Sequence, residues 1–119
     1  MINQNNSTPV LKITDFEDKS LIIVDDDDPL RGRLSRAMEK KGFVVKEAKS
    51  VKEGLELAKT NPPSFAVVDL RLEDGNGLDV VKELHKAKKD SRIVMLTGYG
   101  NLPTAVAAVK AGAIDYLSK

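Results

Sequence analysis

The amino-acid sequence predicts a single α/β domain built on a parallel sheet. From Lys19 onward, short apolar runs typical of buried strands alternate with segments of helical periodicity. This alternation is typical of parallel sheets, whose strands are joined by crossover helices. With 119 residues, the chain has the length of one domain with a substantial core. We expect residues 1–18 to form a partly disordered tail and residues 19–119 to form the domain.

The first strand is predicted at residues 20–25, because the run from Leu21 to Val24 is wholly apolar. Asp28 followed by Pro29 indicates a helix start, with Asp28 as the N-cap and the proline at the first helical position. Gly42 is expected to end this helix in a left-handed conformation. The inward stripe of the helix is predicted to be Leu30, Leu34, Ala37 and Met38.

The second strand is predicted at residues 43–48. The string from Ser50 to Glu53 has the pattern of a capping box, which indicates the start of a second helix. Two prolines after Asn61 end that helix. Its inward side chains are expected to be Val51, Leu55 and Ala58.

The second half of the chain continues the alternation. Strands are predicted at residues 65–69, 92–96 and 114–118. A loop with Gly75 and Gly77 precedes a helix at residues 78–88, which faces inward through Leu78, Val81 and Leu84. Another helix is expected to open at Pro103 and close at Gly112, with Ala105, Val106 and Val109 inward.

Composition excludes several classes of function. The formal net charge is +1 without a basic cluster, so we expect no direct nucleic-acid binding by this chain. There is no cysteine, which excludes disulfides and thiolate chemistry. The sequence has no apolar stretch of membrane-spanning length and no signal pattern at its start, so we expect no membrane association and a cytoplasmic location.

Chemically reactive side chains follow the predicted strands. The first strand leads into Asp25 and Asp26, the third ends in Asp69, the fourth is followed by Thr97, and the last by Lys119. In an open parallel sheet, ligands bind beyond the carboxyl ends of the strands, so we expect these five residues to meet at one edge. Asp27 and Asp28 are interpreted as structural residues at the helix start.

This set suits phosphoryl transfer. Three carboxylates are neutralised best by a hard cation, and Mg²⁺ takes carboxylate oxygens and phosphate oxygens readily. Asp69 is a plausible nucleophile, because carboxylates form aspartyl phosphates. Thr97 can donate to a phosphoryl oxygen, and Lys119 supplies a compact positive charge. Such chemistry needs mainly positioning and charge neutralisation.

Four segments, from Lys19 to Lys119, resemble the response-regulator receiver domain. They are Ile23-Val24-Asp25-Asp26-Asp27, Ala66-Val67-Val68-Asp69, Val94-Met95-Leu96-Thr97-Gly98 and Asp115-Tyr116-Leu117-Ser118-Lys119. Two longer strings, 74–81 and 96–101, resemble the RegA/PrrA/ActR-type redox response regulators, which are global transcriptional regulators of proteobacteria. The resemblance implies a CheY-like, flavodoxin-like, doubly wound five-stranded sheet in the order 2-1-3-4-5.

The resemblance also implies roles for individual residues. Asp69 would be the phosphorylated residue, and the domain would catalyse only its own phosphorylation and slow dephosphorylation. The Mg²⁺ ligands would be Asp26, Asp25 mainly through water, Asp69 and the backbone carbonyl of Arg71. Thr97 would be the switch hydroxyl, Tyr116 the aromatic that changes rotamer, and Lys119 the phosphate-binding lysine. A sensor histidine kinase would be the donor, and a second copy of the chain a partner on phosphorylation.

Two alternatives stay open at this point. The Asp-x-Asp string from Asp25 to Asp27 is also found after a first strand in haloacid-dehalogenase-like phosphatases, which use Mg²⁺ and an aspartate nucleophile. A phosphorylation-independent interaction domain is the other alternative. His85, the single histidine, is expected on the polar side of its helix, at the surface.

Receiver domains continue after the lysine with a proline and a final helix, whereas this sequence stops at Lys119. The DNA-binding output domain expected of the subgroup is also absent from the sequence. We therefore expect a domain truncated before its last helix, with apolar surface left uncovered.

Overall fold

The computed structural model describes residues 18–97, 112–113 and 115–118. The main strands are β1 (Ser20–Val24), β2 (Val44–Ala48), β3 (Phe65–Asp69), β6 (Arg92–Thr97) and β7 (Asp115–Ser118). The helices are α1 (Asp28–Lys40), α2 (Val51–Thr60) and α3 (Gly77–Ala87). A small hairpin of β4 (Arg71–Leu72) and β5 (Gly75–Asn76) lies between β3 and α3.

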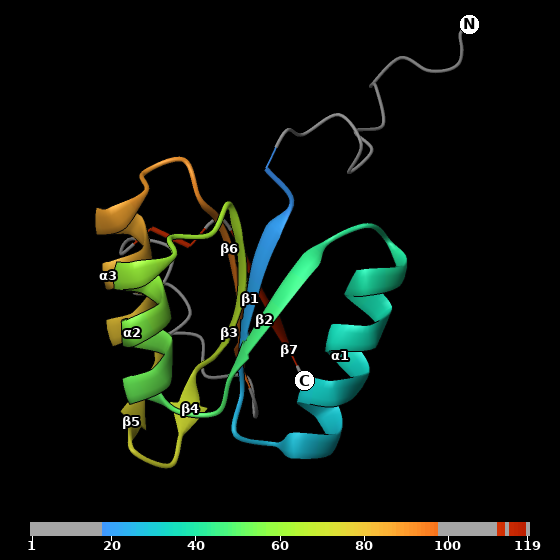
Figure 1. Cartoon of the computed structure of the whole chain (residues 1–119). Helices are drawn as coiled ribbons and strands as arrows, with labels where there is room; N and C mark the ends of the chain where they lie inside the picture. Colours follow the sequence, from blue (N-terminus) through green and yellow to red (C-terminus); the bar gives the residue numbers. More distant parts are fainter. Residues whose placement is uncertain (1–17, 98–111, 114, 119) are drawn as a thin grey trace, which may run out of the picture.

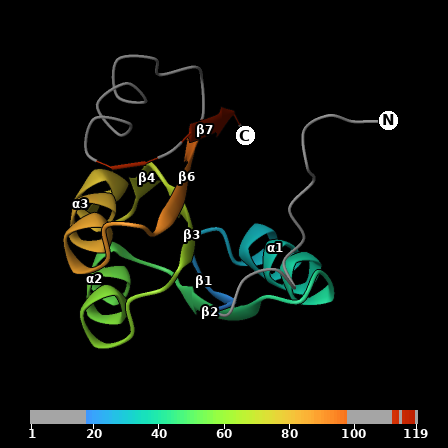
Figure 2. The same ribbon diagram turned by 90° about the horizontal axis from the view of Figure 1, so that it is seen from above.

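The five main strands form one parallel sheet in the order β2-β1-β3-β6-β7. This confirms the predicted order 2-1-3-4-5. Helices α2 and α3 lie on one face of the sheet and α1 on the other (Figures 1 and 2). The chain order reverses direction between β1 and β3, which places a ligand site at the carboxyl ends of those strands.

The hydrophobic core lies between the sheet and the pair α2 and α3. Every second residue of the central strands points into it and is completely or almost completely buried, as are the inward side chains of α3. Burial of one such aliphatic side chain stabilises the fold by about 1.5–3 kcal/mol. The largest contributors are Ile22, Val24, Val68, Val80, Val81, Leu84, Ile93 and Met95.

The opposite face of the sheet is less well covered over β3 and β6. Phe65, Val67, Val94 and Leu96 alternate with the fully buried residues and are only half buried. The reason is that α1 packs against β1 and β2 rather than against β3 and β6 (Figure 2). At the end of the sheet where the strands begin, the rings of Phe43 and Phe65 meet edge to face, with 5.1 Å between their centroids.

The predicted start of α1 is wrong by one residue. Asp27, not Asp28, is the N-cap: its backbone is extended and its carboxylate accepts a hydrogen bond from Leu30 N at 3.0 Å. Asp28 is the first helical residue, and its carboxylate forms an ion pair with Arg31. The shift arises because Asp27 N donates to Asp25 Oδ1 at 2.9 Å, which fixes the direction in which the chain leaves β1.

Two predictions about burial are also wrong. Ala37 is exposed, and the buried residue of α1 is Ser35, because the face turned to the sheet runs through Arg31, Ser35 and Met38. His85 is half buried rather than on the open surface. Its Nδ1 is buried without a hydrogen-bond partner among the described residues, because the turn at Gly112 covers the imidazole.

Other local predictions are confirmed. Gly42 has a φ of 103° and ends α1 in a Schellman motif, with Gly42 N bonded to Glu39 O and Phe43 N to Met38 O.

The helix predicted between Pro103 and Gly112, like most of the tail, lies outside the described residues. Among the described helices, none combines the length and the apolar character needed to cross a bilayer.

Candidate metal and phosphoryl-transfer site

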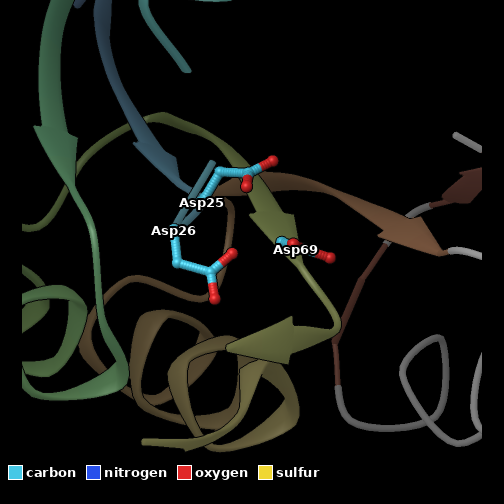
Figure 3. Close-up of side chains that lie close together, drawn as sticks. All are labelled: Asp25, Asp26 and Asp69. Carbon is cyan, nitrogen blue, oxygen red and sulfur yellow. The ribbon is translucent and has the colours of Figure 1, made fainter. Parts of the chain in front are cut away.

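Two neighbouring strands bring three carboxylates together. Strands β1 and β3 are parallel, with Val24 opposite Val68, so the residues that follow on each strand lie at the same edge. On β1 these are Asp25 and Asp26, and on β3 it is Asp69 (Figure 3). The sequence predicted this meeting of residues separated by more than forty positions.

The three carboxylates form a group with the geometry of a cation site. One oxygen from each of Asp25, Asp26 and Asp69 lies within 4.8 Å of the others. Asp25 and Asp69 are almost completely buried, whereas Asp26 is half buried and opens the group to solvent. At an effective dielectric constant near 20, two unit charges at this separation repel by about 3.5 kcal/mol. A divalent cation would relieve that repulsion, so the residues fit Mg²⁺.

The β1 end of the site is held by Arg31 of α1. Its Nη1 donates to the backbone carbonyl of Asp25 at 2.7 Å, and its Nε donates to Glu47 Oε1 at 2.9 Å. Its Nη2 pairs with Asp28 at 2.6 Å. The guanidinium group therefore joins the β1–α1 loop to β2 without occupying the carboxylates of the site.

On the β3 side of the site, the chain continues from Asp69 into the β4–β5 hairpin, which the sequence pattern predicts only as a loop. Arg71 N donates to Asp69 Oδ1 at 3.3 Å, and Gly77 N donates to Leu70 O at 2.8 Å. Asn76 caps α3 by accepting from Leu78 N. The hairpin was missed because each strand has two residues, too short for a periodic pattern.

The structure places Thr97 and Tyr116 by their backbones. Thr97 is the last residue of β6, opposite Ser118 of β7, and Tyr116 is opposite Met95. Leu96 pairs with Asp69, so Thr97 continues β6 from the position beside the acid. Lys119 follows β7 directly in the sequence and lies outside the described residues.

A family model for the response regulator receiver domain matches residues 21–119. The chain belongs to this family. The receiver domain assignment agrees with the sheet order and with the acids at the ends of β1 and β3. It also favours a phosphorylation-controlled module over the phosphatase alternative.

Curated relatives support the narrower resemblance. This receiver domain is 64% identical to the photosynthetic apparatus regulatory protein RegA of Cereibacter sphaeroides over 102 residues, 86% of this chain and 55% of that protein. It is 52% identical to the acid tolerance regulatory protein ActR of Sinorhizobium medicae over 123 residues, all of this chain and 63% of that protein. The chain thus spans about three-fifths or less of these relatives.

Solved structures share the fold. A response regulator from Burkholderia pseudomallei, with a phosphorylated aspartic acid, calcium ion and citrate, matches with a TM-score of 0.81 and 40% identity. The match covers 86% of this receiver domain and 60% of that chain. A CheY-like receiver domain protein from Methanospirillum hungatei matches with a TM-score of 0.80 and 31% identity, covering 85% and 81% of the two chains.

Proposed function

We propose that this receiver domain accepts a phosphoryl group on Asp69 while Mg²⁺ is bound by Asp25, Asp26, Asp69 and the backbone carbonyl of Arg71. The observation that supports this most strongly is the group of three carboxylates within 4.8 Å, two of them buried. The similar Burkholderia pseudomallei protein has a phosphorylated aspartic acid and a calcium ion, which agrees with an acid of this kind as acceptor.

In the proposed reaction, a carboxylate oxygen of Asp69 attacks the phosphorus atom of a phosphohistidine on a sensor histidine kinase. The new O–P bond forms as the P–N bond breaks, and the electron pair of that bond returns to the imidazole nitrogen. Bound Mg²⁺ supplies charge neutralisation for the phosphoryl oxygens. Asp25 and Asp26 hold the cation beside Asp69, and hydrolysis of the acyl phosphate later returns the free carboxylate.

The response to phosphorylation is proposed to use the ends of β6 and β7. The hydroxyl of Thr97 donates to a phosphoryl oxygen, Lys119 pairs with another, and Tyr116 changes rotamer. Support comes from the strand register, which places the backbones of Thr97 and Tyr116 on the two strands beyond Asp69. The charge change at Asp69 thereby biases a two-state element.

The output is proposed to be transcriptional, through a DNA-binding domain outside this chain. The relatives RegA and ActR are named as regulatory proteins, and a further relative, FixJ of Rhizobium meliloti, 35% identical, is named as a transcriptional regulatory protein; the chain covers only part of each. We further propose a cytoplasmic location, homodimer formation on phosphorylation and no direct contact between this domain and nucleic acid.

The test is phosphorylation by a small-molecule donor. The protein is incubated with acetyl phosphate or phosphoramidate, with and without Mg²⁺, and weighed by intact mass spectrometry. We expect a gain of one phosphoryl group that requires Mg²⁺ and is lost in Asp69→Asn. Asp90→Asn, the same chemical change at an exposed acid after α3, is the matched control and should be phosphorylated normally. A phosphoryl gain that survives Asp69→Asn would refute the assignment.

A further inference from the structure

Asp74 connects the hairpin after Asp69 to the beginning of α2. Its Oδ1 accepts from Val51 N at 2.8 Å and its Oδ2 accepts from Lys52 N at 3.1 Å, across 23 and 22 residues of sequence. These two bonds hold the pKa of Asp74 below its usual value, because they stabilise the ionised carboxylate. Both carboxylate oxygens are therefore engaged with backbone amides of another element.

The amides that Asp74 serves cannot be satisfied within α2. The first amides of a helix have no carbonyl partner in the helix itself. The side-chain oxygen of Ser50, the N-cap, accepts from Glu53 N at 3.1 Å and not from Val51 N or Lys52 N. The N-terminus of α2 thus has a local cap, Ser50, and a tertiary cap, Asp74, and the two can be removed separately.

Asp74 also fixes the free end of the hairpin. Arg71 pairs with Asn76 and Leu72 with Gly75, so residues 73–74 form the turn at the tip. At the base, Gly77 N bonds to Leu70 O, and Leu72 is buried in the core. The hairpin is therefore held at both ends, and Arg71 lies between them.

The tip of the hairpin and the metal group border the same cavity. This cavity has a volume of about 340 Å³ and is lined by Asp26, Asp28, Lys49, Ser50, Glu73 and Asp74. Without the bonds to α2, the hairpin would be held only at its base, and its tip could shift in this space and leave the neighbouring Arg71 less firmly placed. We propose that Asp74 is a positioning residue for the metal site: by tying the hairpin tip to α2 it holds the Arg71 carbonyl toward the divalent cation.

This inference rests on the proposed function, so its test begins with wild-type protein. Mg²⁺ affinity is measured by titration calorimetry on the wild type, Asp74→Ala, Glu73→Ala and Ser50→Ala. We expect Asp74→Ala to weaken Mg²⁺ binding on the order of 10-fold, the size typical of groups that orient metal ligands. Asp74→Asn, which keeps one acceptor oxygen, should restore part of the affinity.

The two other variants separate positioning from simpler effects. Glu73→Ala removes the same charge from the same turn and cavity, and Ser50→Ala weakens the start of α2 without touching the hairpin. The Mg²⁺ dissociation constants of both variants should lie within about 2- to 3-fold of the wild-type value, well below the roughly 10-fold change expected for Asp74→Ala. If either variant loses as much affinity as Asp74→Ala, the positioning role is refuted.

Amide hydrogen exchange provides a second readout that needs no phosphorylation. In wild-type protein, Mg²⁺ should slow exchange at Val51 N and Lys52 N, because coupling between two sites is reciprocal. In Asp74→Ala, those amides should exchange faster and should no longer respond to Mg²⁺. If the wild type binds Mg²⁺ and the two amides of Asp74→Ala respond to Mg²⁺ as those of the wild type do, the positioning role of Asp74 is refuted and the metal site stands. If the wild type binds no Mg²⁺, both the proposed metal site and the positioning role are refuted.

Discussion

Replacing Gly77 with alanine should destabilise the domain and disturb Asp69 directly. Gly77 is the first residue of α3, and a Cβ there would lie 3.0 Å from both the carbonyl carbon of Asp69 and Cγ1 of Val68. It would be closer still to the carbonyl oxygen of Asp69. To reach an ordinary van der Waals distance, the backbone after Asp69 would have to retreat by about 1 Å.

The size of the effect follows from what has to move. Overpacking costs about 1–3 kcal/mol, and here the obstacles are backbone and a buried valine, which favours the upper end. The better helix propensity of alanine offsets at most about 1 kcal/mol. A net loss of about 2 kcal/mol corresponds to a drop in melting temperature of about 10 °C for a domain of this size.

The assay is urea and thermal unfolding followed by far-UV circular dichroism. Gly32→Ala in α1 is the matched control, because its Cβ would meet only Arg36 Nη1, at 3.4 Å. That variant should be as stable as the wild type or up to about 1 kcal/mol more stable. Gly77→Ala should also be phosphorylated more slowly at Asp69. A Gly77→Ala variant with wild-type stability would refute the overpacking argument.

Two further predictions concern charged groups. Arg31→Ala should lower the free energy of unfolding by about 2 kcal/mol, because it removes bonds to a backbone carbonyl and two carboxylates. Arg33→Ala, on the exposed side of α1, is the control and should change the free energy of unfolding little. Equal losses for the two variants in urea unfolding would contradict the role of Arg31. Hydrogen bonds from Ser20, and then from Lys88, hold the pKa of Asp18 well below its usual range. Since the folded pKa lies below the unfolded one, this stabilisation is present above about pH 4 and is lost as the pH falls below it. Between about pH 7 and pH 3, Asp18→Asn should therefore lose less stability than the wild type. The difference should be under about 1 kcal/mol, because the Asp18–Lys88 pair is half exposed. If the two proteins show the same pH dependence in urea unfolding, this prediction is wrong.

Local sequence patterns predicted most of the described fold. Gly42 and Ser50 end and begin helices as expected, because each acts within one turn of its own helix. The five strands of the main sheet begin and end within one residue of the predicted positions. The prediction of Asp28 as the N-cap of α1 was wrong because two adjacent aspartates have the same capping preference. The hydrogen bond from Asp27 N to Asp25 Oδ1 decides between them.

The burial of His85 could not be predicted from the periodicity of its helix. The imidazole lies on the polar side of α3, yet the turn at Gly112 passes over it, at a distance where an added Cβ would lie 2.5 Å from the ring. The half-buried face of β3 and β6 is equally a matter of where α1 packs. Both depend on elements that are distant in sequence.

The sequence by itself determined the parallel α/β architecture and the meeting of Asp25, Asp26 and Asp69, because the carboxyl ends of parallel strands share one edge of the sheet. Only the tertiary structure decided what supports that edge. Arg31 reaches the carbonyl of Asp25 because α1 packs on β1 and β2, and Asp74 caps α2 because the hairpin folds back against it. Such hydrogen bonds join groups that approach each other only in the folded chain, so local composition and spacing cannot predict them.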